Sequence, residues 1–302
     1  MKAFLHLFVI CFLCLPAYNQ SVEEYLNSAS QKIQNYDYSG AVGDYTKALA
    51  MEKDNTDILY ERGRACFIME DYPAAVNDFN RLVTLKPEFA SGWMYRGAVK
   101  IELTDYDGAM KDLNKALEIN PEYAEAYFHR GRCHFFLQEP GAREDYSLAI
   151  SFNPAYVDAY YSRGHSREIA GDLQGALEDY TRLIELEPDN GLRYYDRGDA
   201  RKSVQDNEGA LEDFTRATEL SPDWAATWLA AGTLKIILED YQGALTDLNR
   251  AVELNPEDGE GYYFRGLAGI KLDSKESACD DFTKAAELGF SKADEAKKEF
   301  CP

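Results

Sequence analysis

The chain has 302 residues, with 32 Lys and Arg against 53 Asp and Glu, and its formal net charge is −21. Such an acidic surface repels nucleic acid and anionic lipid, and no cluster of basic residues stands ready to hold phosphates. We therefore expect no nucleic-acid partner and no stable membrane insertion.

An apolar run from Ala3 to Leu15 opens the chain. Its thirteen residues are too few to span a bilayer comfortably. Polar residues follow, so residues 1–20 are typical of a secretory signal peptide that is cleaved near Ala17–Gln20. Bulky residues precede Cys11 and Cys14, which argues against a lipoprotein. We expect the mature chain in the periplasm or outside the cell.

Behind this segment, alanine recurs with a step of 34 residues that shortens once to 33. A single compact core leaves no such period, whereas a stack of similar units does. Glycine recurs with the same period, and a large apolar residue stands four positions before it. A second large apolar residue stands four positions after the alanine, and a proline ends most units. The alanines are Ala41, Ala75, Ala109, Ala142, Ala176, Ala210, Ala244 and Ala278, and the glycines are Gly63, Gly97, Gly131, Gly164, Gly198, Gly232 and Gly266.

This pattern resembles the tetratricopeptide repeat (TPR) family, of the kind that bacteria export, and it covers about residues 22–290. The resemblance implies an all-α fold, a right-handed α-solenoid of eight helix-turn-helix repeats. Neighbouring units must stack, because one unit cannot bury its apolar face alone. We expect repeats to start near residues 22, 56, 90, 124, 157, 191, 225 and 259, and a capping helix within residues 291–302.

Aspartate recurs between the two helices expected in each unit, as at Asp172, where its carboxylate can cap the second helix. Glycine within the first helix costs about 0.5–1 kcal/mol against alanine. We expect this glycine to face the recurring alanine of the second helix, so that the two backbones approach. Repeat 4 is one residue short around Pro140, and we expect a tighter turn there.

Four cysteines follow the expected signal peptide. Cys66 and Cys133 belong to repeats that are not neighbours, so we interpret them as unpaired and buried. Cys279 lies in the last repeat and Cys301 at the end of the expected capping helix. In an oxidising compartment a disulfide between them would pin that helix over the open end of the core, and we expect this disulfide.

We find no catalytic constellation in the sequence: no nucleophile elbow, no zinc-protease motif and no phosphate loop. His129 and Cys133 share one helix face, and His165 follows in the next repeat. No further ligand completes a tetrahedral metal site. We expect no enzyme, no cofactor and no metal.

Arginine directly before the glycine and aspartate directly before the late apolar residue recur together. This shared period favours a structural role over a ligand site, and we expect partly buried Arg–Asp pairs that run along the stack. The arginines are Arg62, Arg96, Arg130, Arg163, Arg197 and Arg265, and the aspartates are Asp44, Asp78, Asp112, Asp145, Asp179, Asp213, Asp247 and Asp281.

The resemblance also suggests a binding groove, because the first helices of TPR proteins line a concave face. The fifth and twelfth positions of the repeats are mostly aromatic or apolar here, and the ninth adds polar groups. These residues either contact a ligand or pack between neighbouring first helices. The candidates are Tyr60, Arg64, Phe67, Met94, Phe128, Arg132, Phe135, Tyr161, His165, Tyr195 and Tyr263.

We therefore expect a monomeric, non-catalytic scaffold that binds a protein or peptide in this groove, outside the cytoplasm. The alternative is a carbohydrate-associated or substrate-presenting module of the cell envelope, in which the aromatic side chains stack on sugars.

Overall fold

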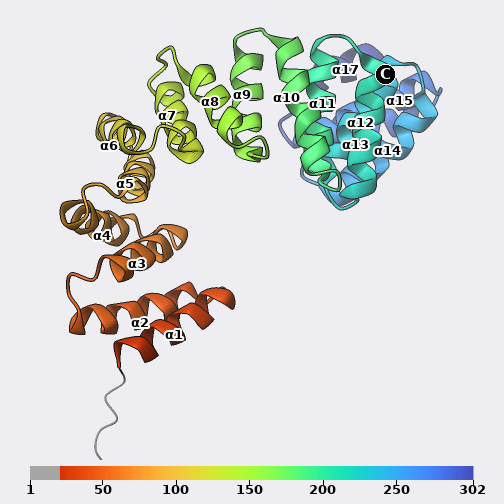
Figure 1. Ribbon diagram of the computed structural model, residues 1–302. Coiled ribbons are helices and arrows are strands. Elements are labelled where there is room, and N and C mark those ends of the chain that lie inside the picture. Colours follow the sequence, from red (N-terminus) through yellow and green to blue (C-terminus); the bar gives the residue numbers. More distant parts are fainter. Residues whose placement is uncertain (1–20, 302) are drawn as a thin grey trace, which may run out of the picture. The chain divides into compact units, whose positions relative to one another are not determined.

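The computed structural model describes residues 21–301, which form seventeen α-helices and no strand (Figure 1). The predicted signal peptide lies outside these residues. None of the helices described is long and apolar enough to cross a bilayer. The first helices of the repeats are α1 (Val22–Gln34), α3 (Thr56–Ile68), α5 (Ala90–Glu102), α7 (Ala124–Phe136), α9 (Val157–Ile169), α11 (Gly191–Ser203), α13 (Ala225–Ile237) and α15 (Gly259–Lys271). The second helices are α2 (Tyr38–Met51), α4 (Tyr72–Leu85), α6 (Tyr106–Ile119), α8 (Ala142–Phe152), α10 (Leu173–Leu186), α12 (Asn207–Leu220), α14 (Tyr241–Leu254) and α16 (Lys275–Glu287), and α17 (Ala293–Phe300) closes the series.

The helices pack in consecutive pairs, and within each of two compact units a second helix packs on the first helix that follows it, as in a TPR solenoid. The predicted all-α class is confirmed. The chain divides into two compact units, one up to Pro121 and one from Glu122 onward, so that three repeats belong to the first and five to the second. This division was not predicted, because the repeat register runs through it unchanged.

Aspartate caps hold the start of most second helices. The Asp172 carboxylate accepts a hydrogen bond from the Gly175 amide at 3.1 Å, which satisfies one of the free amides of the first turn. The same cap forms at Asp37, Asp71, Asp105, Asp206 and Asp240, as predicted.

The glycine of each first helix makes room for the late apolar side chain of its own repeat. A Cβ on Gly198 would lie 2.8 Å from a ring carbon of Phe214, and one on Gly63 would lie 2.8 Å from Phe79. The expectation that this glycine faces the recurring alanine holds for the backbone in four repeats, although the late apolar side chain lies nearer. The alanine contributes at most a backbone oxygen, 3.3 Å from such a Cβ in the pair of Gly232 and Ala244.

Repeat 4 absorbs its missing residue in the helix and not in the turn. Helix α8 has 11 residues, whereas α6 and α10 have 14. The turn from Phe136 to Ala142 is consequently longer than its counterparts, so the expected tighter turn is wrong. Gly141 takes a φ of 122° at the start of α8, where no side chain caps the helix.

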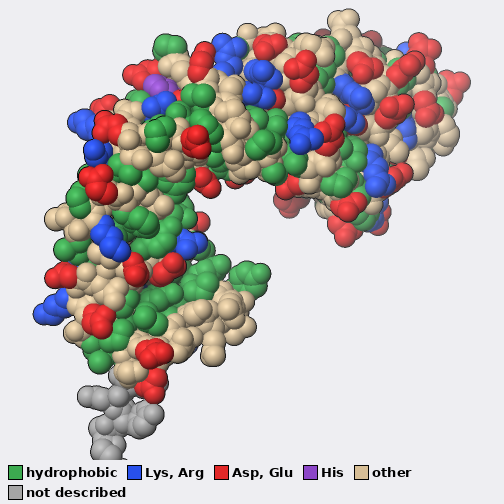
Figure 2. Space-filling view, in the orientation of Figure 1, with side chains coloured by type: hydrophobic (Ala, Val, Ile, Leu, Met, Phe, Trp, Pro, Cys, Tyr) green, Lys and Arg blue, Asp and Glu red, His purple; other side chains and the backbone are tan. Residues whose placement is uncertain are grey.

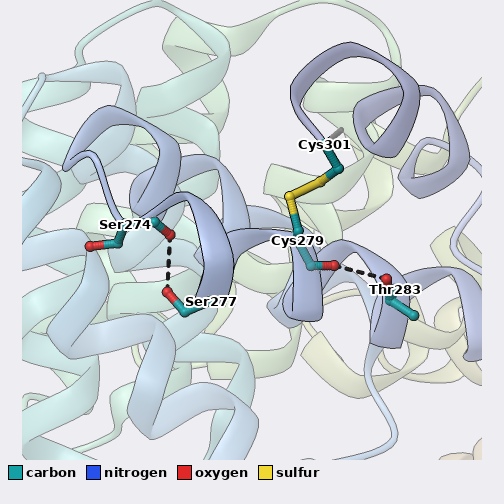
Figure 3. Close-up of a disulfide and its surroundings, with 5 residues drawn as sticks. All are labelled: Ser274, Ser277, Cys279, Thr283 and Cys301. Atoms are coloured by element: carbon teal, nitrogen blue, oxygen red, sulfur yellow. Dashed lines mark hydrogen bonds between the residues drawn. A yellow bond between two sulfur atoms is a disulfide. The ribbon is translucent and has the colours of Figure 1, made fainter.

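A disulfide joins Cys279 on α16 to Cys301, directly behind α17, with a Cα–Cα distance of 5.8 Å (Figure 3). Under this link Phe300 of α17 stacks on the fully buried Phe282 of α16, with ring centroids 6.1 Å apart. Helix α17 therefore covers the apolar side of the last repeat. Cys66 and Cys133 are free and buried.

Replacing Gly198 by alanine should lower the free energy of unfolding by about 1–3 kcal/mol, because the added methyl group overlaps Phe214. Gly43 is the matched control, since a Cβ there meets nothing within 4 Å. Gly43→Ala should raise the free energy of unfolding by about 0.5–1 kcal/mol, as for any exposed helical glycine. Denaturant titration measures both, and equal effects would contradict the packing described.

Reduction of the Cys279–Cys301 disulfide should cost about 3 kcal/mol of stability, because the link closes a loop with a sequence separation of 22. The measurement is thermal unfolding with and without reductant. The double variant Cys279→Ser, Cys301→Ser should melt at the same temperature in both conditions. A reductant effect of equal size in the double variant would show that the stabilisation comes from elsewhere.

Candidate functional site

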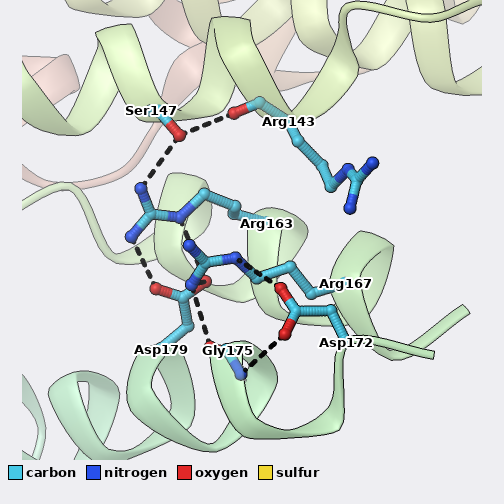
Figure 4. Close-up of polar contacts among 7 residues, drawn as sticks. All are labelled: Arg143, Ser147, Arg163, Arg167, Asp172, Gly175 and Asp179. Atoms are coloured by element: carbon cyan, nitrogen blue, oxygen red, sulfur yellow. Dashed lines mark hydrogen bonds and ion pairs between the residues drawn. The ribbon is translucent and has the colours of Figure 1, made fainter. Parts of the chain in front are cut away.

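The most regular polar feature is a buried carboxylate in each repeat. The Asp179 side chain is 2 % exposed, and Arg163 grips it with two nitrogens, Nη2 to Oδ1 at 2.6 Å and Nε to Oδ2 at 3.0 Å (Figure 4). Arg167 donates a further hydrogen bond to Oδ2 at 2.9 Å. Bidentate bonds of this kind are among the strongest that side chains form.

The same bidentate pair of hydrogen bonds from arginine to aspartate recurs in five other repeats. It joins the pairs Arg62–Asp78, Arg96–Asp112, Arg130–Asp145, Arg197–Asp213 and Arg265–Asp281. Repeats 1 and 7 lack this arginine. In them a lysine of the first helix forms the ion pair with the buried aspartate, Lys32 with Asp44 at 2.5 Å and Lys235 with Asp247 at 2.7 Å. These carboxylates are therefore structural and are not open to a ligand.

The third nitrogen of the arginine links neighbouring repeats. Arg163 Nη1 donates to Ser147 Oγ on the preceding second helix at 3.0 Å (Figure 4). Corresponding bonds run from Arg62 to Thr46, from Arg96 to Asn80, from Arg197 to Thr181 and from Arg265 to Asn249. Sequence reasoning missed these acceptors, although Thr, Asn or Ser stands two residues after every one of the aspartates.

The groove candidates differ in exposure. Met94 and Phe128 are only 3 % and 8 % exposed, so for these two the packing alternative applies. Tyr161 is 39 % exposed and Phe135 is 36 % exposed. The remaining candidates are partly buried.

In the first unit, Tyr60, Arg64 and Phe67 gather around Tyr95 of α5. The Tyr95 ring lies 5.6 Å from that of Tyr60 and 6.3 Å from that of Phe67, and the Arg64 guanidinium lies 5.7 Å from its centre. Tyr95 stacks on Phe79 beneath it. Tyr95 was not among the candidates, because it occupies the sixth position of its repeat and not the fifth.

In the second unit, His165 lies between Phe135 and Tyr161, with ring centroids 6.0 and 6.4 Å away, both edge to face. The guanidinium of Arg193 lies 5.6 Å from the Tyr161 ring centre. The structure thus brings three of the candidates together across α7 and α9.

Apart from the buried Phe128, the other candidates of this unit each contact a neighbour that is not a candidate. Tyr195 packs against Trp224 and Tyr263 against Phe290, each at 4.9 Å, and Arg132 lies over Phe136.

Asp196 on α11 is the most perturbed carboxyl near these residues. Burial raises its pKa to about 6, Glu168 and Asp199 act in the same direction, and Arg193 at 3.7 Å opposes them. Its Oδ2 atom is buried and has no hydrogen-bond partner among the described residues. Sequence reasoning missed Asp196 for the same reason as Tyr95, since it too occupies the sixth position.

His129 and Cys133 of the metal hypothesis are both turned inward. Burial lowers the pKa of His129 to about 3 and raises that of the Cys133 thiol to about 12, so both are neutral at pH 7. Within residues 21–301, no group of three or more His, Cys, Asp or Glu side chains is placed to hold a metal ion.

Tetratricopeptide repeat models match residues 28–90, 157–190 and 229–290, and a TPR repeat model matches residues 97–135. Together they span more than half of the chain. No curated protein shows significant similarity.

Several solved structures share the fold. One is the C-terminal part of a TPR repeat-containing protein from Cytophaga hutchinsonii, with a TM-score of 0.66, 18 % identity, and 78 % of this chain and 98 % of that chain covered. Another is YrrB, described as a TPR protein with an unusual peptide-binding site, with a TM-score of 0.55, 22 % identity, and 62 % and 97 % covered. A tetratricopeptide repeat protein from Parabacteroides merdae gives a TM-score of 0.50 at 20 % identity, with 93 % and 97 % covered.

Asp179→Ala should lower the free energy of unfolding by about 3 kcal/mol or more, because it leaves Arg163 and Arg167 without their shared buried partner. Glu178→Ala removes the same charge from an exposed site on the same helix and should change the free energy by less than about 0.5 kcal/mol. Denaturant titration of both variants checks this. Similar losses in the two would mean that the buried network adds nothing to stability.

Asp196→Asn should raise stability at pH 7 by up to about 3 kcal/mol. The folded chain holds the Asp196 proton to a higher pH than the unfolded chain, so the native protein loses stability as the pH rises from about 4 to about 6. The asparagine variant lacks this loss, and at pH 4 the two proteins should be equally stable. Melting temperatures at both pH values measure the effect, and a gain independent of pH would contradict it.

Proposed function

Because the chain belongs to the tetratricopeptide repeat family, we propose that it is a non-catalytic scaffold that binds protein or peptide partners through the faces of its first helices. The proposal assigns no cofactor and no metal, and it takes the protein to be a monomer. TPR proteins similar to it in structure include one described as having a peptide-binding site.

The observation that carries this proposal is the aromatic surface formed by Phe135, Tyr161 and His165. Large apolar side chains with a third or more of their surface in water mark interaction sites when they lie together. Aromatic side chains also contribute much of the energy of protein interfaces, because they bury a large area at small entropic cost. The Arg163 network lies in the same first helix, α9, and holds it in place from the side of α10.

We also propose that the protein works outside the cytoplasm, in the periplasm or beyond it. The composition of residues 1–20 supports an exported precursor. The Cys279–Cys301 disulfide supports the same location, because such links persist in oxidising compartments.

A photoreactive residue at position 161, introduced in the native host, tests the function. We expect a small set of crosslinked proteins, identified by mass spectrometry, whose yield falls several-fold when Tyr195→Ala is added. The same photoreactive residue at exposed position 178 on α10 is the control and should give none of these products. Equal crosslinking from both positions would refute a partner in the groove, and glycan-array binding without protein crosslinks would favour the carbohydrate alternative.

A further inference from the structure

A cavity of about 440 Å³ opens between α1, α2 and α3 in the first unit. This volume falls within the range of sites that hold ligands. Leu26, Ile33 and Ile58 supply much of its apolar lining, and Asp57 and Glu61, both well exposed, lie beside them. In Figure 2, hydrophobic side chains gather over this part of the chain.

The next groove of the same unit shows what such a space accommodates. Between α3, α4 and α5 the corresponding place is filled by the ring of Tyr95, which stacks on Phe79 at 5.6 Å and contacts Tyr60 and Phe67. The residues that correspond to these one repeat earlier, 34 positions back, are Tyr45, Leu26 and Ile33, and all three line the cavity. Glu61 stands where Tyr95 stands in the next repeat, so the first groove lacks its aromatic plug.

Tyr45 adds a hydrogen-bond donor to this cavity. Its side chain is 5 % exposed, and it lines the cavity. Tyr180, at the same position of repeat 5, donates to Glu168 at 3.0 Å. In repeat 1 the place of Glu168 is taken by Ile33, which cannot accept a hydrogen bond. Because Tyr45 lines the cavity, an occupant that fills it takes water away from this hydroxyl and has to bring an oxygen in its place to accept the hydrogen bond.

The charges around the cavity favour a basic neighbour for the occupant. Asp57 and Glu61 are the charged residues of the lining, and both are acidic. Asp57 pairs with the exposed Lys86 at 3.1 Å and Glu61 with the partly exposed Arg64 at 3.2 Å, and pairs that lie in contact with solvent are worth little. An incoming cation can therefore replace them at small cost.

We propose that this cavity receives one aromatic side chain of a protein or peptide partner, next to a Lys or Arg of that partner that pairs with Asp57 and Glu61. The ring takes the place that Tyr95 takes in the next groove, and a backbone oxygen of the partner accepts the hydrogen bond of Tyr45. The inference rests on the proposed function and deepens it, since it names the chemistry of one anchor and places it in the first unit.

Three capped tetrapeptides test the anchor, each with glycine at both ends. Their central residues are phenylalanine–arginine, phenylalanine–glutamate and serine–arginine. Titration is followed by NMR of isoleucine methyl groups, among them those of Ile33 and Ile58. We expect saturable shifts at these two methyl groups with phenylalanine–arginine, binding at least fivefold weaker with glutamate, and none with serine.

Glu61→Tyr is the decisive variant, because it places a tyrosine ring in the cavity, as Tyr95 is placed in the next groove. It should abolish tetrapeptide binding and raise the melting temperature. Tyr45→Phe should weaken binding several-fold without lowering the melting temperature, and exposed Glu178→Tyr on α10 should change neither. The proposal is overturned if Glu61→Tyr binds the phenylalanine–arginine peptide as well as the unchanged protein does, or if the serine–arginine peptide binds as well as the phenylalanine–arginine peptide. If Glu61→Tyr does not fold, unchanged binding of the phenylalanine–arginine peptide by Tyr45→Phe overturns it.

The outcome is separable from that of the crosslinking at position 161. Tetrapeptide binding without site-specific crosslinks would leave the cavity proposal standing and refute the groove of the second unit. Site-specific crosslinks without tetrapeptide binding would refute the cavity proposal and leave the groove of the second unit standing.

Discussion

The second helix of each of the eight repeats buries an aspartate, and the need to satisfy this carboxylate governs much of the architecture. A buried charge without partners is strongly destabilising, so the first helix must present a cation at the matching height. Arginine does so with two nitrogens in six of the repeats, and in five of these a third nitrogen bonds to the preceding second helix, as in the bond from Arg163 to Ser147. The contact between repeats is thus set by directional hydrogen bonds as well as by apolar packing, which is not directional.

This shared frame leaves the faces of the first helices free to differ. The sixth position is Glu61 in repeat 2, Tyr95 in repeat 3 and Asp196 in repeat 6, and the surroundings differ accordingly: an open cavity, a filled aromatic cluster and a perturbed carboxyl. Side chains that recur with the period carry the fold, and those that break the period carry the chemistry of the surface. Specific recognition by such a protein would therefore reside in the differences between otherwise similar repeats.

Much of the fold follows from the sequence, because the features that define it are local or recur eight times. The aspartate caps and the all-α class depend on short spacings, which a sequence displays directly. The shortened α8 could not be foreseen, because a missing residue can be absorbed by a turn or by a helix and tertiary packing decides between them. The burial of Met94 and Phe128 depends on the size of side chains in neighbouring helices, and the fifth-position rule takes no account of it. The role of Tyr95 and Asp196 was missed because that rule leaves out the sixth position.

The covalent tie between α16 and Cys301 makes the array asymmetric. Stacked repeats lose structure first where a unit has a neighbour on one side only. At the late edge the disulfide keeps α17 over Phe282, whereas at the early edge Asp44 is held by Lys32 in place of an arginine fork. We therefore expect the hairpin of α1 and α2 to open before the last repeat does, and its amide protons to exchange with solvent sooner.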